Sequence, residues 1–189
     1  MAIKIVPEHL FTYMLKDISG SRFEALSKLI FSCVFKEAFQ PLGGMHDGGA
    51  DGLLSSYIQE LKGKPTTFVQ FSVTGETGVK KKIQDTIDAL RKAGREPKQL
   101  IYGSNASLPK ADVIAQEIFD SHTVMVQVRD FERLRGYVNS DDCANQVFHE
   151  FFSDEINALS RAAHLNLSAV TRYAQDPTVY VYLNHELRD

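Results

Sequence analysis

Two short stretches of the chain contain the residue types that a hard divalent cation needs. An acidic residue, Asp51, ends a glycine-rich turn that begins at Asp47, and Gln70 lies within the apolar run from Phe68 to Ser72. Carboxylate, amide and backbone carbonyl oxygens, together with water, are the ligands that Mg²⁺ takes in proteins. If the two stretches are neighbouring strands, Asp51 and Gln70 can share one cation, which suggests metal-assisted phosphodiester chemistry.

Each of these residues also has a purely structural interpretation. Asp–Gly pairs are common in surface turns, so Asp51 can be a turn residue, and Asp47 is expected to stabilise the same turn. Strand alternation places Phe68, Gln70 and Ser72 on one face, where a buried amide needs hydrogen-bond partners. Gln70 can therefore equally belong to a structural hydrogen-bond network.

Hydrophobic periodicity predicts an α/β fold with a mixed central β-sheet flanked by helices. Predicted helices begin at residues 7, 21, 79 and 108, and predicted strands cover 38–42, 53–61, 66–73, 99–103 and 123–128, with a hairpin turn at 62–65. Strands that alternate with helices after the hairpin indicate parallel crossovers. Beyond residue 130 the pattern predicts short helices at 131–137, 144–152, 154–163 and 168–174. We expect one α/β domain over residues 1–138 and a helical C-terminal extension over 139–189, which packs on it or leads to a further domain.

The amino-acid composition indicates in which cellular compartment the protein works and which partners it can attract. The 189 residues are 43% hydrophobic and 24% charged, as in globular domains, and the net charge of −3 gives no global attraction for nucleic acid. Cys33 and Cys143 make no zinc-ligand pattern, and Cys33 is expected to be a core thiol in a reducing compartment. No signal peptide or membrane-spanning run is present in this sequence, so we expect a soluble, cytoplasmic protein.

The order of the motifs resembles the Mrr-like branch of the PD-(D/E)XK nuclease superfamily, which has the restriction-endonuclease-like fold. The similarity extends over residues 21–128, the core of the domain, and lies in the runs Phe23 to Leu26, Asp47 to Gly52 and Val69 to Ser72. Members of this family carry a glutamate on a helix, an aspartate on a strand and a Gln/Glu-x-Lys sequence on the next strand. The glycine-rich aspartate motif is the most specific part of the match.

The resemblance implies a ligand set for Mg²⁺, with Mn²⁺ as a substitute. Asp51 matches the strand aspartate, Gln70 the residue after it, and the carbonyl of Phe71 the backbone ligand. Glu24 matches the helix carboxylate. Independently of the resemblance, Ser21 and Glu24 have the spacing of a capping box, so Glu24 can instead serve to start its helix.

This chain departs from the family at Ser72, which stands where the family has lysine. A hydroxyl cannot supply the positive charge that offsets charge developing on the phosphorane. In variants with Gln-aromatic-Ser the next helix carries an apolar residue and, three positions on, a lysine, which Val79 and Lys82 fit. We therefore assign the role to Lys82, with Lys80 as the second choice. The alternative is a solvated basic helix start, in which Lys81 points to water.

These features predict a Mg²⁺-dependent endodeoxyribonuclease domain that acts on double-stranded DNA. By resemblance it is the effector module of a bacterial restriction or antiphage defence protein, as a homo-oligomer or with fused sensor or ATPase domains. Phosphate contacts would come from the most basic region of the chain, namely Lys80, Lys81, Lys82, Arg91, Lys92, Arg95 and Lys98. The alternative is a catalytically inactive nuclease fold used for nucleic-acid binding or assembly. A small-molecule phosphate enzyme is disfavoured, because no phosphate-cradling motif is present.

Overall fold

The computed structural model describes residues 5–42, 49–55 and 65–174, with residues 164–174 described by their backbone alone. The chain divides into two units, one ending at Phe151 and the other beginning at Phe152. Up to residue 174, where the description ends, the second unit contains one helix, α8 (Ser153–Ala174). The prediction of two separate helices there was wrong, because residues 164–167 contain no glycine or proline that would interrupt the helix.

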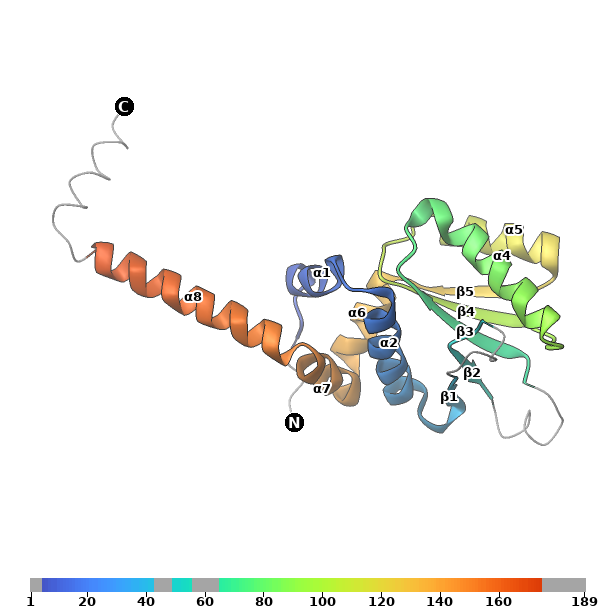
Figure 1. Ribbon diagram of the computed structural model, residues 1–189, viewed down its shortest axis with the longest axis horizontal. Helices are drawn as coiled ribbons and strands as arrows, with labels where there is room; N and C mark the ends of the chain where they lie inside the picture. Colours follow the sequence, from blue (N-terminus) through green and yellow to red (C-terminus); the bar gives the residue numbers. More distant parts are fainter. Residues whose placement is uncertain (1–4, 43–48, 56–64, 175–189) are drawn as a thin grey trace, which may run out of the picture. The chain divides into compact units, whose positions relative to one another are not determined.

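The first unit is built on a five-stranded mixed sheet with the order β1-β2-β3-β4-β5 (Figure 1). Its strands are β1 (Phe39–Pro41), β2 (Gly52–Leu54), β3 (Thr67–Ser72), β4 (Gln99–Ser104) and β5 (Met125–Arg129). Strand β2 is antiparallel to both β1 and β3, whereas β3, β4 and β5 are parallel to one another. This confirms the predicted mixed sheet. Most of the predicted strand 53–61 and of the turn 62–65 lies outside the described residues.

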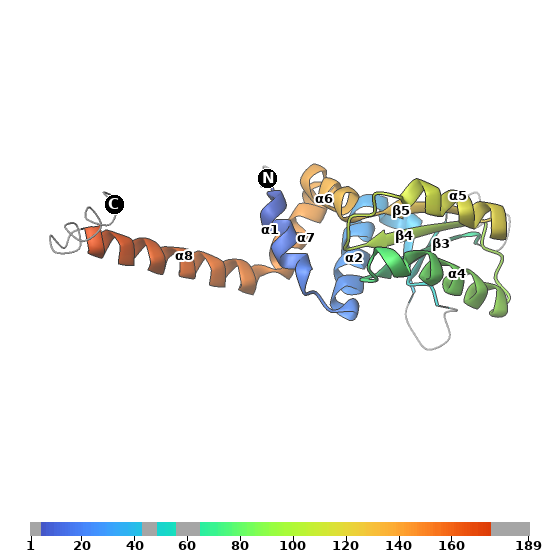
Figure 2. The same cartoon turned by 90° about the horizontal axis from the view of Figure 1, so that it is seen from above.

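The described part of the first unit also contains helices beside this sheet and at one end of it (Figure 1). They are α1 (Glu8–Lys16), α2 (Gly20–Phe35), α4 (Glu76–Lys92), α5 (Ala111–His122), α6 (Phe131–Ser140) and α7 (Asp142–Phe151), with a 3₁₀ turn, η1, at Lys36–Ala38. Figures 1 and 2 both show α2, α6 and α7 grouped at one end of the sheet. The α/β architecture with flanking helices agrees with the sequence-based prediction.

Side chains of β3 point alternately to the two faces of the sheet, and each face makes its own hydrophobic contacts. Phe68 belongs to the buried cluster that includes Ile83 and Ile87 of α4, so this face of the sheet is covered by α4. Phe71 points to the opposite face, where its ring centroid lies 4.9 Å from that of Phe31 on α2. Gln70 shares the face of Phe68, as predicted, because side chains two residues apart on a strand point the same way.

The N-terminus of α2 differs from the prediction in one respect that bears on the site. Ser19, not Ser21, is the N-cap residue, and its hydroxyl accepts a hydrogen bond from the backbone N–H of Arg22 at 3.3 Å. The capping box of Ser21 and Glu24 is therefore wrong, because the helix begins earlier than the sequence pattern indicated. Glu24 is free of a capping role.

Cys33 is buried, as expected of a core residue, but it is not a free thiol. It forms a disulfide with Cys143, 110 residues further along the chain. The expectation of an unpaired core thiol was wrong, because α7 packs on α2 and brings the first turn of α7 beside Cys33. Among the described residues, none of the helices has the length and apolar character needed to cross a membrane.

Candidate metal centre

Asp51 is held at the start of β2 by main-chain hydrogen bonds on both sides. Its N–H donates to the carbonyl of Val69 on β3 at 2.8 Å, and its carbonyl accepts from the N–H of Leu42 at 2.9 Å. Gly49, two residues earlier, has a φ of 83°, a left-handed conformation that favours glycine. The backbone of Asp51, which follows the glycine-rich turn, is therefore held between Val69 of β3 and Leu42.

The side chains of Asp51 and Gln70 meet directly. The amide nitrogen of Gln70 donates to Asp51 Oδ2 at 2.7 Å and to the carbonyl oxygen of Phe71 at 2.9 Å. The N–H of Phe71 also donates to Asp51 Oδ2, at 2.6 Å. One carboxylate, one side-chain amide and one backbone carbonyl thus converge, and these are the three groups that the resemblance implied.

Thr86 of α4 completes the hydrogen bonding of Gln70. Its hydroxyl lies 3.4 Å from Gln70 Oε1, and it donates to the carbonyl oxygen of Lys82 at 2.9 Å. Gln70 is 5% exposed, so its polar atoms must be satisfied within the protein. The structural hydrogen-bond network that the sequence left open does exist, and it involves the same atoms as the candidate ligand set.

A cavity of about 450 Å³ opens beside this cluster and brings further predicted residues to it. Glu24 reaches the cavity from α2 and Lys82 from α4. The lining residues are Gly20, Glu24, Gly49, Ala50, Asp51, Gln70, Phe71, Ser72, Val73 and Lys82. This cavity is therefore bordered by five of the sequence-predicted residues, namely Glu24, Asp51, Gln70, Phe71 and Lys82.

Lys28 is a residue near this site that the sequence analysis missed. Its ammonium lies 2.6 Å from Glu24 Oε1 and 2.5 Å from the carbonyl oxygen of Leu42. It therefore connects α2 to the residue that hydrogen-bonds the main chain of Asp51. The i, i+4 spacing of Glu24 and Lys28 on a helix is a signal that could have indicated the pair.

The electrostatics of Asp51 reflect its partly enclosed position. Burial raises the pKa of Asp51 from 3.8 to about 6, and the negative charge of Glu24 acts in the same direction. The hydrogen bond from Phe71 N–H and the positive charges of Lys28 and Lys82 lower this pKa, but they do not offset the loss of hydration. A nearby cation would therefore stabilise the ionised form of this carboxylate.

Ser72, which replaces the family's lysine, belongs to a small cluster of hydroxyl groups. Its hydroxyl lies 2.6 Å from that of Thr74 and accepts from the N–H of Thr74 at 3.1 Å. Burial raises the pKa of Tyr102 on β4, and the neighbouring hydroxyls of Ser72 and Thr74 oppose that shift. This position of the cavity wall therefore carries no positive charge of its own.

The three lysines at the start of α4 have different surroundings. Lys82 lines the cavity, whereas Lys80 forms an ion pair with Glu117 of α5 at 2.9 Å and is not among the lining residues. Lys81 is exposed, as predicted. The structure thus favours Lys82 over Lys80 as the ammonium near Asp51. Asp47, which was expected to stabilise the turn, lies outside the described residues.

Comparison of the chain with protein-family models, with curated proteins and with solved structures gave no match.

Proposed function

We propose that this chain is a metal-dependent DNA endonuclease domain with a restriction-endonuclease-like fold, similar to the Mrr-like branch of the PD-(D/E)XK superfamily. One observation carries the proposal. The Gln70 amide nitrogen lies 2.7 Å from Asp51 Oδ2 and 2.9 Å from the Phe71 carbonyl oxygen, and all three residues line an open cavity. Glu24 and Lys82 line the same cavity, so it combines oxygen ligands with an acidic and a basic side chain.

The ligand set fits a hard divalent cation in chemistry and in spacing. Carboxylate, amide and carbonyl oxygens are the donors that Mg²⁺ and Mn²⁺ prefer. The Gln70 amide nitrogen lies 2.7 Å from Asp51 Oδ2 and 2.9 Å from the Phe71 carbonyl oxygen, so the three groups are close enough to share one ion.

The hydrogen bonds of Gln70 are compatible with a role as ligand. The two terminal atoms of an amide occupy equivalent positions, so either can face Asp51 and Phe71. Thr86 supports both arrangements. Its hydroxyl donates to the Lys82 carbonyl and keeps lone pairs that can accept from the Gln70 amide nitrogen. With Gln70 Oε1 facing Asp51 and the Phe71 carbonyl, three acceptor oxygens meet, and a bound cation would be the partner that they share.

Five of the residues around the cavity are given a part in hydrolysis. A bound Mg²⁺ would supply Lewis acidity toward a phosphodiester oxygen and toward the attacking water. Asp51, Gln70 and the Phe71 carbonyl would hold the ion. Glu24 orients the water through a hydrogen bond, and the Lys82 ammonium stabilises the negative charge that develops on the phosphoryl oxygens.

Substrate and partners follow from the charges beside the cavity. Lys81 and Lys82 are exposed on α4 and can contact phosphates, whereas Lys80 is paired with Glu117 and Arg91 donates to the carbonyl of His122 at 2.6 Å. Two of the five cations on α4 are thus already engaged, so we propose that the domain binds double-stranded DNA weakly by itself. A second copy, or a fused sensor or ATPase domain, would supply further contacts in a cytoplasmic restriction or antiphage defence protein.

The direct test is cleavage of supercoiled and linear double-stranded DNA by the purified chain, with Mg²⁺ or Mn²⁺. We expect nicking or cutting that EDTA stops, and we expect Asp51→Ala and Gln70→Ala to reduce it by about a hundredfold or more. Lys110→Ala is the control, because Lys110 is exposed, does not line the cavity and has no assigned part in DNA binding. DNA that stays intact with both metals, in the monomer and in any oligomer, contradicts the proposal.

The second candidate function is an inactive nuclease fold that binds nucleic acid or assembles partners. Ser72 favours it, because its hydroxyl is engaged with Thr74 and brings no charge to the position of the family's lysine. Binding of labelled DNA by the wild type and by Asp51→Ala separates the two functions. Equal binding of the two proteins without cleavage by the wild type supports the inactive fold.

A further inference from the structure

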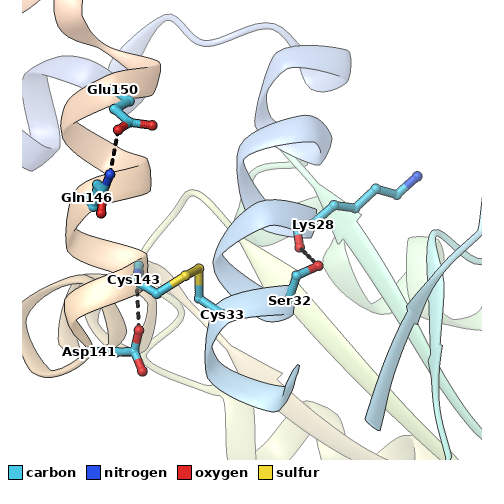
Figure 3. Close-up of a disulfide and its surroundings, with 8 residues drawn as sticks. Lys28, Ser32, Cys33, Asp141, Cys143, Gln146 and Glu150 are labelled. Carbon is cyan, nitrogen blue, oxygen red and sulfur yellow. Dashed lines mark hydrogen bonds between the residues drawn. A yellow bond between two sulfur atoms is a disulfide. The ribbon is translucent and has the colours of Figure 1, made fainter. Parts of the chain in front are cut away.

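The disulfide between Cys33 and Cys143 lies beside a carboxylate. Cys33 is on α2, Cys143 is in the first turn of α7, and Asp141 immediately precedes that helix (Figure 3). The two sulfur atoms and a carboxylate oxygen of Asp141 all lie within 4.8 Å of one another. These three residues take no part in the cavity around Asp51, so they form a separate cluster of metal-ligating groups.

Contacts other than the disulfide hold the helices that carry this cluster. The amide of Asn145 on α7 donates to the carbonyl of Val138 on α6 at 3.1 Å. The ring of Tyr137, also on α6, lies 6.2 Å from that of Phe31 on α2. Phe148 of α7 is fully buried. These contacts do not include the sulfur–sulfur bond, so they remain available to hold α2 and α7 when the bond is reduced.

The orientation and exposure of the three side chains suit an ion that arrives from solvent. The backbone N–H of Ala144 donates to Asp141 Oδ1 at 2.9 Å, which fixes the carboxylate, as outer hydrogen bonds do around metal ligands. Cys33 is buried, Asp141 is half-buried and Cys143 is exposed. An ion would thus contact a buried sulfur on one side and water on the other.

We propose that Cys33, Cys143 and Asp141 form a binding site for Zn²⁺, or another thiophilic divalent ion, when the disulfide is reduced. Two thiolates and one carboxylate are a donor set that Zn²⁺ accepts, with water as the fourth ligand of a tetrahedron. A cellular dithiol supplies the two electrons and two protons that convert the bridge to two thiols, and is itself oxidised to a disulfide. Ion binding then releases the two thiol protons. The bridge and the ion are therefore mutually exclusive, and a reducing compartment favours the ion.

The test uses Co²⁺ as a spectroscopic probe of the full-length chain. The protein is reduced, freed of reductant without oxygen and titrated with Co²⁺, whose thiolate charge-transfer and tetrahedral d–d bands report sulfur ligation. We expect one equivalent to bind, Zn²⁺ to displace it, and the oxidised protein to show no such bands. Asp51→Asn is the control, because it removes the other candidate centre and should leave the bands unchanged.

Two variants decide whether all three side chains are ligands. Cys33→Ser should abolish the two-thiolate spectrum, and Asp141→Asn should weaken Co²⁺ binding by about tenfold or more. The proposal is overturned if the reduced wild type shows no thiolate bands, or if Asp141→Asn binds as tightly as the wild type. It is also overturned if the near-ultraviolet circular dichroism of the reduced chain is lost, because the site requires α2 and α7 to remain packed.

Discussion

The Lys28 ammonium lies 2.6 Å from Glu24 Oε1, one turn away along α2. The same ammonium contacts the carbonyl oxygen of Leu42, whose N–H donates to the carbonyl of Asp51. A single side chain thus links the helix that carries one candidate catalytic carboxylate to the segment that carries the other. Lys28 is therefore a positioning residue for the cavity, in addition to neutralising part of its negative charge.

Replacing Lys28 with methionine should lower stability as well as activity. The substitution keeps most of the apolar stem but leaves the Leu42 carbonyl without this donor, so we expect a loss of about 1–2 kcal/mol in the free energy of unfolding. Without this positive charge the pKa of Asp51 should rise further, and cleavage at neutral pH should fall. Urea unfolding and a pH profile of cleavage measure the two effects. Lys110→Met should change neither, because Lys110 is exposed and outside the cavity, and equal behaviour of both variants contradicts the positioning role.

Asp51→Asn should make the metal-free protein more stable at neutral pH. The pKa of Asp51 is about 6 in the folded chain and 3.8 in the reference state, so the folded state binds the proton more tightly. The resulting contribution to stability is fully present below pH of about 4 and is lost as the pH rises through about 6. An uncharged asparagine removes this loss. Thermal unfolding in EDTA should show a gain at pH 7.5, by about 1–2 kcal/mol after allowing for solvent screening, and little gain at pH 4.

Mg²⁺ binding should follow the ionisation of the same carboxyl group. A proton and a cation compete for Asp51, so the apparent affinity should rise by up to about tenfold per pH unit below the pKa of about 6 and level off above it. Isothermal titration at several pH values measures this dependence. Asp51→Asn should lose most of the binding, and Thr86→Val should weaken it less, because Thr86 contacts Gln70 and not the ion. Binding that does not vary between pH 5 and pH 7 contradicts Asp51 as a ligand.

Lys82 and Lys80 offer two matched alanine variants on one helix. Lys82→Ala should reduce the rate of cleavage by about a hundredfold and weaken DNA binding by a much smaller factor, because this ammonium acts mainly on charge that develops in the transition state. Lys80→Ala breaks only an exposed ion pair with Glu117, so it should change stability by less than about 1 kcal/mol and leave the rate nearly unchanged. If Lys80→Ala is the slower enzyme, the assignment of Lys82 is wrong.

Sequence patterns were sufficient for the parts of the fold that depend on local periodicity. The apolar stripe of Val79, Ile83 and Ile87 predicted α4, and the alternation around Gln70 predicted which side chains of β3 share a face. The juxtaposition of Asp51 and Gln70 followed from treating their segments as neighbouring strands. These inferences hold because a strand or helix face can be read from residues that are close in sequence.

Features that depend on contacts between distant segments could not be read in this way. The pairing of Cys33 with Cys143 requires α7 to pack on α2, and no spacing rule links two residues 110 positions apart. Nothing in the sequence distinguishes Thr86 from the other threonines, and its role is visible only from the position of its hydroxyl beside Gln70. The start of α2 at Gly20 depends on the backbone geometry of Ser19, which competed with an equally good capping pattern at Ser21.

Phe71 serves the proposed centre through its main chain while its ring is locked against Phe31 in the hydrophobic interior. Such an oxygen cannot be deleted by exchanging a side chain, since all twenty amino acids carry it. Natural variants of this chain that have lost the activity should therefore carry a substitution at Asp51 or Gln70. Position 71 should stay aromatic in them, because its ring packs against Phe31.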